Sequence, residues 1–176
     1  MVFKFFIFSG LLLLVAFNLQ AQNILPETIP GSSVSFKMAL VPGGKFQMGS
    51  PETIQRQVQV DSFWMGIHEV RYDEFIIFYH RERDSDASQN PAAKFSADAV
   101  TRPTPQYIDY TYGMGKEGFP VVSMTQQAAL RYCKWLYEKT GNFYRLPTEA
   151  EWEFACRFAN DELLTMNYEP LGDFAW

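Results

Sequence analysis

The sequence predicts an α+β domain made of short strands, about three helices and a long irregular segment. Two observations support this fold class. Apolar and polar residues alternate along residues 35–68, as in half-buried strands, and apolar residues recur at helical spacing in three later segments. A chain of 176 residues with 47% hydrophobic and 20% charged residues has the length and composition of one globular domain, which disfavours intrinsic disorder.

The first 21 residues have the pattern of a signal peptide. Lys4 precedes an uncharged apolar run from Phe5 to Phe17, which is shorter than the ~18 residues of a membrane-spanning helix. We predict cleavage after Ala21, and an uncleaved interfacial or signal-anchor helix is the alternative. Because no cysteine lies near this position, a lipoprotein anchor is disfavoured. We therefore expect a periplasmic or secreted protein without a stable membrane anchor.

The remaining chain is predicted to contain a linker over residues 22–33 and one partial domain over residues 34–176. Alternation within Ser35–Gly49, interrupted by Pro42-Gly43-Gly44, predicts a β-hairpin with its turn at those three residues. Alternation from Gln57 to His68 predicts a third strand. Its phase changes near Asp61, as at a β-bulge.

The first helix is predicted from Tyr72 to about Arg81, because Phe75 and Phe78 have helical spacing and two acidic residues lie in the first turn. Residues 81–118 are rich in proline and glycine and have no sustained period, so we predict an irregular segment. The aromatic residues in this segment and directly after it are expected to pack against the domain; they are Tyr107, Tyr110, Tyr112 and Phe119.

Two further helices are predicted. Thr125 is expected to cap the second and Gly141 to end it, with Ala129, Tyr132, Cys133 and Leu136 on its buried face. The third is expected after Pro147, because Thr148 and Glu151 have the spacing of a capping box. Its predicted buried stripe comprises Trp152, Ala155, Cys156 and Ala159.

Charge and motif spacing exclude several classes of function. The formal net charge is -5 and the sequence has no basic cluster, which argues against nucleic-acid binding. His68-Glu69 lacks the second histidine of a zinc peptidase, since position 72 is Tyr72, and His80 is expected on the surface. Gly43-Gly44 lacks the lysine and hydroxyl residue of a phosphate-binding loop.

The remaining candidates for chemistry are three glutamates and two cysteines. Capping and solvated roles are favoured over acid-base catalysis for Glu149, Glu151 and Glu153, because alternate positions on a helix diverge. In an oxidising compartment Cys133 and Cys156 can pair with each other, pair with a cysteine outside this chain, or stay reduced. Their apolar surroundings favour a structural role. The sequence therefore predicts no catalytic, cofactor-binding or metal-binding residue.

The most specific feature is the string R-L-P-T-E-A-E-W-E at residues 145–153. It closely resembles the hallmark of the sulfatase-modifying factor family, the formylglycine-generating enzymes and their relatives. Leu40–Gly44, Met48-Gly49, Glu69-Val70, Pro120–Val122 and Tyr132-Cys133 with Trp135 agree with the family in the same order, and Thr101–Pro105 resembles a bacterial subgroup. We expect structural roles for the motif residues Arg145, Leu146, Pro147, Thr148, Glu149, Glu151, Trp152 and Glu153.

The resemblance implies a C-type-lectin-like fold that is truncated here at its C-terminus. In active members, molecular oxygen oxidises a sulfatase cysteine to formylglycine through a cysteine pair that can bind copper. That pair, and most calcium-binding segments, correspond to positions beyond Leu171–Trp176. Cys133 and Cys156 match family positions that form structural disulfides with downstream cysteines. No cofactor is therefore expected within this chain, and copper and calcium are expected only in a full-length relative.

The leading hypothesis is the N-terminal part of an exported formylglycine-generating-enzyme-like protein that acts on an exported protein such as a sulfatase. Whether the protein is an enzyme stays open, and the chain alone is expected to be inactive. The alternatives are a non-catalytic protein- or glycan-binding or cell-envelope assembly module on the same fold, and a truncated product that aggregates. Two departures from the family are Arg71, at a position where a hydroxyl residue commonly caps the first helix, and Gln126-Gln127-Ala128, which replaces a tryptophan-containing stretch.

Overall fold

The computed structural model describes residues 24–49, 54–85, 87–91, 100–104, 111, 113 and 115–165, with the backbone alone for 159–165. Its elements, in chain order, are β1 (Ile24–Thr28), β2 (Ser35–Val41), β3 (Gly44–Met48), β4 (Arg56–Val60), β5 (Phe63–Gly66), α1 (Tyr72–Tyr79), the 3₁₀ helix η2 (Arg81–Arg83), α2 (Gln126–Thr140) and α3 (Glu149–Thr165). This confirms the predicted α+β class and the three helices. Across this part of the chain, none of the helices has the length and apolarity to cross a membrane. The predicted signal peptide lies outside it.

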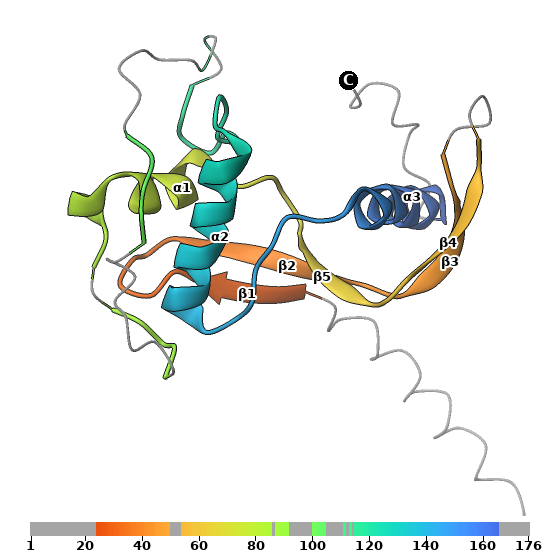
Figure 1. Ribbon diagram of the computed structural model, residues 1–176, viewed down its shortest axis with the longest axis horizontal. Helices are drawn as coiled ribbons and strands as arrows, with labels where there is room; N and C mark the ends of the chain where they lie inside the picture. The colour runs from red at the N-terminus through yellow and green to blue at the C-terminus, as the bar shows by residue number, and fades with distance from the viewer. Residues whose placement is uncertain are drawn as a thin grey trace, which may run out of the picture.

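The strands form two small antiparallel sheets, one of order β1-β2-β5 and one that pairs β3 with β4 (Figure 1). The predicted hairpin between β2 and β3 is therefore wrong, although both strands exist. Val41 pairs with Phe63 and Gly44 with Val60, so the register is the same on both sides of the interruption. One long two-arm ribbon results, and its chain direction reverses between Met48 and Arg56.

The interruption of this ribbon has a local cause at Pro42-Gly43. Proline has no N–H to donate to a strand ladder. A Cβ on Gly43 would lie 2.8 Å from both the backbone nitrogen of Ser62 and the carbonyl oxygen of Val60, so only glycine fits against the facing arm. Because the register does not shift there, the bulge expected near Asp61 is absent and the predicted third strand is instead divided into β4 and β5.

Strand β1 was not predicted. It lies inside the range expected to be a linker and pairs along its length with β2, from Ile24 opposite Ala39 to Thr28 opposite Ser35. Ile24 and Leu25 remain exposed on this edge strand. Ile29, directly after β1, is fully buried in the main core. The range 22–33 thus contributes both a strand and a core residue.

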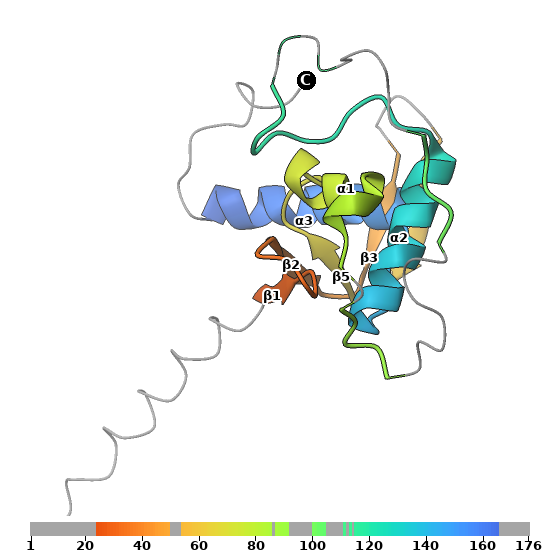
Figure 2. The ribbon, with the colours of Figure 1, turned by 90° about the vertical axis from the view of Figure 1, so that its left-hand side faces the viewer.

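The main core lies where α1 and α2 pack together beside the three-stranded sheet (Figures 1 and 2). Its aromatic rings form a continuous group, in which Phe78 contacts Phe75, Tyr132 and Trp135 at centroid distances of 5.4–5.8 Å. Edge-to-face and tilted contacts of this kind add to the free energy of burying the rings. The spacing of Phe75 and Phe78 correctly predicted this face of α1.

Helix α2 begins and ends as predicted, but its buried face is rotated about the helix axis, so that the half-buried Ala129 gives way to the buried Ala128. The Thr125 hydroxyl accepts a hydrogen bond from the Ala128 N–H at 3.2 Å, and Gly141 ends the helix in the left-handed conformation with φ 82°. Both are standard helix caps. The buried residues are Ala128, Tyr132, Trp135, Leu136 and Lys139. Cys133, expected on that face, is only half-buried.

Helix α3 packs against strands β3 and β4 rather than against the main core (Figure 1). Phe154 meets Phe46 of β3 at a ring-centroid distance of 5.3 Å. The buried stripe predicted for α3 is wrong at Trp152, which is 59% exposed, and at Cys156, which is also exposed. Ala155 is half-buried, and the side chain of Ala159 lies outside the described residues. The helix is rotated so that Glu153 and Phe154 face strands β3 and β4 instead.

The described parts of the irregular segment are anchored to both α1 and α2. Asn90 is buried, and its side chain donates to the Tyr137 carbonyl at 3.1 Å. Val100 is buried in the main core. Phe119, one of the aromatics expected to pack, is 47% exposed, whereas Tyr107, Tyr110 and Tyr112 lie outside the described residues.

Candidate functional site

The first half of the family motif builds the N-terminus of α3. The Glu151 carboxylate accepts from the Thr148 backbone N–H at 2.8 Å, and the Thr148 hydroxyl accepts from the Glu151 N–H at 3.2 Å. This reciprocal pair is the predicted capping box. Arg145 adds two hydrogen bonds to the same carboxylate, at 2.5 and 2.7 Å. Three motif residues therefore converge on one helix end.

This arrangement changes the acidity of Glu151. The pKa of Glu151 falls from 4.5 to about 2, chiefly because the Arg145 guanidinium donates to its charged form. Partial burial opposes the change, and the two Thr148 hydrogen bonds add to it. A carboxylate held ionised in this way is a poor proton donor near neutral pH. The geometry supports the capping role rather than acid catalysis.

The second half of the motif fixes α3 to the β3–β4 ribbon. The Glu153 carboxylate accepts from the Gly49 N–H at 3.0 and 3.3 Å, and Arg157 bonds both Glu153, at 2.5 Å, and the Gly49 carbonyl, at 2.8 Å. Gly49 has a φ of 103°, which residues with a side chain rarely adopt. Met48-Gly49, one of the segments that resemble the family, thus contacts Glu153 of the R-L-P-T-E-A-E-W-E string directly. Sequence spacing gave no sign of it.

The other motif residues face solvent. Leu146 is 37% exposed, Trp152 is 59% exposed, and Glu149 is also exposed. Pro147 precedes the cap and is exposed as well. Leu146 and Trp152 add apolar surface to the outer side of this helix end.

The two cysteines lie on different parts of the fold. Both are free, with Cys133 half-buried on α2 and Cys156 exposed on α3. Burial raises the pKa of both thiols, and nearby Glu153 raises that of Cys156 further. A reactive cysteine needs the opposite shift. Figure 1 shows α2 and α3 apart, so the described residues do not fit a two-thiolate copper site.

A buried charged cluster joins the segment after α1 to α2. Asp84 accepts hydrogen bonds from Arg102 at 2.5 Å and Trp135 at 2.9 Å, and it forms an ion pair with Lys139 at 2.6 Å. Lys139 is fully buried and also donates to the carbonyls of Ser85 and Ala87. Sequence analysis missed this cluster, because Arg102 and Trp135 lie in segments that resemble the family but nothing in those segments indicates a contact with Asp84 or Lys139.

The cluster stabilises the ionised form of Asp84. Burial alone would raise the pKa of Asp84, but hydrogen bonds from Lys139, Trp135 and Arg102 outweigh it and lower the pKa. Paired buried charges rigidify a structure, whereas breaking one pair leaves the other charge uncompensated. Its side chains are buried, so the cluster offers no surface to a substrate and we assign it a structural role.

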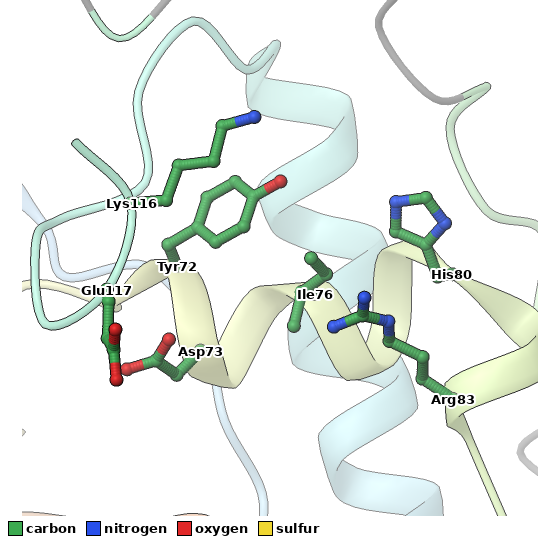
Figure 3. Close-up of a pocket in the computed structure, with 7 residues that line it drawn as sticks. All are labelled: Tyr72, Asp73, Ile76, His80, Arg83, Lys116 and Glu117. Carbon is green, nitrogen blue, oxygen red and sulfur yellow. The ribbon is translucent and has the colours of Figure 1, made fainter. Parts of the chain in front are cut away.

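An open groove lies between α1 and residues 115–118 (Figure 3). It has a volume of about 470 Å³ and is lined by Tyr72, Asp73, Ile76, His80, Arg83, Lys116 and Glu117. The Lys116 amine lies 5.3 Å from the Tyr72 ring centroid, and Asp73 accepts from the Gly118 N–H at 3.2 Å. These contacts fix the loop to the helix. The groove is the candidate binding site of the described chain.

Metal binding finds no support in this part of the protein. No group of three or more histidine, cysteine, aspartate or glutamate residues there could hold an ion. His80 bonds Glu82 at 2.9 Å at the end of α1, and His68 is exposed. Calcium needs about six to eight oxygen ligands, more than the groove's two carboxylates supply.

Comparison with known proteins adds independent information. Residues 27–169 match the family described as the sulfatase-modifying factor enzyme 1-like domain. A formylglycine-generating enzyme of Bos taurus is 29% identical over 75% of this chain and 43% of its own length, and one of Mus musculus is 26% identical over 69% and 40%. A serine/threonine-protein kinase pkn1 of Chlamydia pneumoniae is 29% identical over 77% of this chain and 21% of its own length.

These matches cover less than half the length of each relative. No solved structure matches the chain significantly. The match to the family extends over most of the chain, and the ordered motifs fold into one capped and clamped helix. The chain therefore belongs to the sulfatase-modifying factor family.

Proposed function

We propose that this chain is the N-terminal, scaffold-building part of an exported formylglycine-generating-enzyme-like protein. The whole protein would oxidise a cysteine of an exported protein, such as a sulfatase, to formylglycine with molecular oxygen. The observation that carries the proposal is the folded family motif, in which Glu151 caps α3 and Glu153 holds it on the ribbon. The two relatives named formylglycine-generating enzyme support it.

The proposal assigns the described residues a supporting role. Their two thiols lie on separate helices and both have a raised pKa, so neither is prepared to react. The oxidising cysteines and any copper would then belong to another part of the whole protein. Export rests on the signal-peptide pattern of residues 1–21.

The experiment compares the 176-residue chain with the protein encoded by the complete reading frame. Each is incubated in air, with copper and a thiol reductant, with a cysteine peptide from a sulfatase, and the aldehyde is trapped and measured by mass spectrometry. We expect conversion by the complete protein and none by the chain alone. Conversion by the chain alone would contradict this division of roles.

A second function, a non-catalytic protein- or glycan-binding or cell-envelope assembly module, is favoured by two observations. The domain also matches a fifth of the length of proteins named serine/threonine-protein kinase pkn1, so it occurs outside proteins named for formylglycine formation. The groove beside α1 offers a binding surface without an oxidising group. If the complete, copper-loaded protein leaves the peptide unchanged, the binding module replaces the oxidase as the proposed function.

A further inference from the structure

The groove between α1 and residues 115–118 separates its charges. Figure 3 shows the carboxylates of Asp73 and Glu117 next to each other on one side of Tyr72. The Lys116 amine, the His80 ring and the Arg83 guanidinium lie on the other side. Two carboxylates face two permanently charged cations, so the groove is close to neutral overall but strongly dipolar.

We propose that this groove binds an extended peptide segment that carries one acidic and one basic side chain about three residues apart. The acidic side chain would lie among Lys116, His80 and Arg83, and the basic one beside Asp73 and Glu117. A polyanion or polycation would meet like charge at one end of the groove. A dipolar segment meets opposite charge at both ends.

The spacing follows from helix geometry. Asp73, in the first turn of α1, and His80, which directly follows the last residue of α1, are seven residues apart, which corresponds to about 10 Å at ~1.5 Å per residue. An extended chain in the polyproline II conformation rises ~3.1 Å per residue with three residues per turn, so side chains three residues apart span the same distance and point to the same side. The volume of about 470 Å³ also suits a segment of this size.

The groove is largely preorganised for such a ligand. Its floor is the half-buried Tyr72 ring and Ile76, which offer apolar surface to the peptide backbone. Asp73 fixes the loop through the Gly118 N–H, and the Tyr72 N–H donates to the Phe119 carbonyl at 2.8 Å. Less ordering is then needed on binding. The inference goes beyond the proposed function and does not depend on it, because an oxidase and a binding module could both use the groove.

The test measures the binding of a fluorescently labelled peptide to the full chain by anisotropy at low ionic strength. The peptide contains Glu-Ala-Ala-Arg between neutral flanks, and three matched peptides replace the glutamate, the arginine or both with glutamine. We expect the dipolar peptide to bind at least tenfold more tightly than the doubly neutral one. Equal affinities for all four peptides, or equal affinities for the dipolar and the acid-only peptide, would overturn the proposal.

Variants then locate the site. Arg83→Gln and Lys116→Gln should each weaken binding of the dipolar peptide about threefold, as expected for exposed ion pairs, and should not affect the peptide without glutamate. Glu117→Gln should also weaken binding of the dipolar peptide about threefold, and it should not affect the peptide without arginine. Lys134→Gln on α2 removes one positive charge and Glu149→Gln on α3 removes one negative charge, both from exposed side chains outside the groove. Both variants should leave the affinity unchanged.

A charge-reversed variant and a charge-reversed peptide together distinguish loss of a contact from loss of the fold. Arg83→Glu should bind the dipolar peptide more weakly than the unmodified chain does. It should bind a peptide in which lysine replaces the glutamate more tightly than the unmodified chain does. Recovery of this kind requires a folded groove and direct contact. Failure of Arg83→Glu to distinguish the two peptides, with an unchanged circular dichroism spectrum, would contradict the proposed position of the acidic side chain.

Discussion

The two parts of this fold are held together by different means. Where α1 and α2 pack beside the three-stranded sheet, Trp135, Phe78 and Lys139 are completely buried and the charges of Asp84 and Lys139 face each other away from water. Where α3 packs on β3 and β4, the contacts are Phe46–Phe154 and partly exposed ion pairs. The family motif belongs to the second part. The most conspicuous sequence motif here makes partly exposed contacts, whereas the buried Asp84 and Lys139 lie outside every motif.

The largest effect is expected in the first part, from Asp84→Asn. The change leaves the buried Lys139 and Arg102 facing a neutral side chain, and the free energy of unfolding should fall by about 3 kcal/mol. Urea unfolding at neutral pH measures it. The exposed Lys134→Gln on α2 is the control and should change the free energy by less than ~0.5 kcal/mol. A loss below ~1 kcal/mol for Asp84→Asn would show that the cluster contributes no more than a surface ion pair.

A smaller effect is expected in the second part, from Glu153→Gln. Its carboxylate accepts from Gly49 and Arg157, and charge-assisted hydrogen bonds typically contribute about 1.5–3 kcal/mol. Because Arg157 is 46% exposed, we expect a loss of about 1.5 kcal/mol in the same urea assay. Glu149→Gln, in the first turn of the same helix, is the matched control. If the two variants lose equal stability, the contact with Gly49 contributes little.

The smallest effect is expected from Glu151→Gln and depends on pH. A lowered carboxylate pKa stabilises the fold above the ordinary value of 4.5, and this contribution is lost as the pH falls toward about 2. At pH 7 the variant should be less stable by about 1 kcal/mol, since Arg145 is 47% exposed and solvent screens the pair. The difference from the unmodified chain should shrink between pH 4.5 and 2. A difference that stays constant over this range would exclude a charge-based role.

The local features were predictable from the sequence, and the long-range ones were not. Both caps of α2 and the capping box of α3 follow from residues within four positions of each other. The pairing of β3 with β4 instead of β2, and the Asp84–Lys139 pair, depend on residues far apart in the chain. Alternation indicates that a strand exists but not which strand pairs with it.

The candidate sites show the same limit. The string from Arg145 to Glu153 predicted a capped helix, but the contact of Glu153 with Gly49 requires the folded ribbon. The groove brings α1 together with residues 115–118, which have no shared motif. The inward face of α3 was predicted wrongly, because Trp152 and Cys156 are apolar and were expected to be buried. In the structure both are exposed, and Phe154 packs against Phe46 of β3 instead.

Hydrogen exchange followed by mass spectrometry tests most directly the claim that the motif holds α3 to the ribbon and acts only there. It is measured on the unmodified chain and on Glu153→Gln. We predict that amides of α2 exchange most slowly in both proteins, while those of β3, β4 and α3 exchange at least fivefold faster in the variant. Equal acceleration across α2 and α3, or no acceleration in either, would contradict the account.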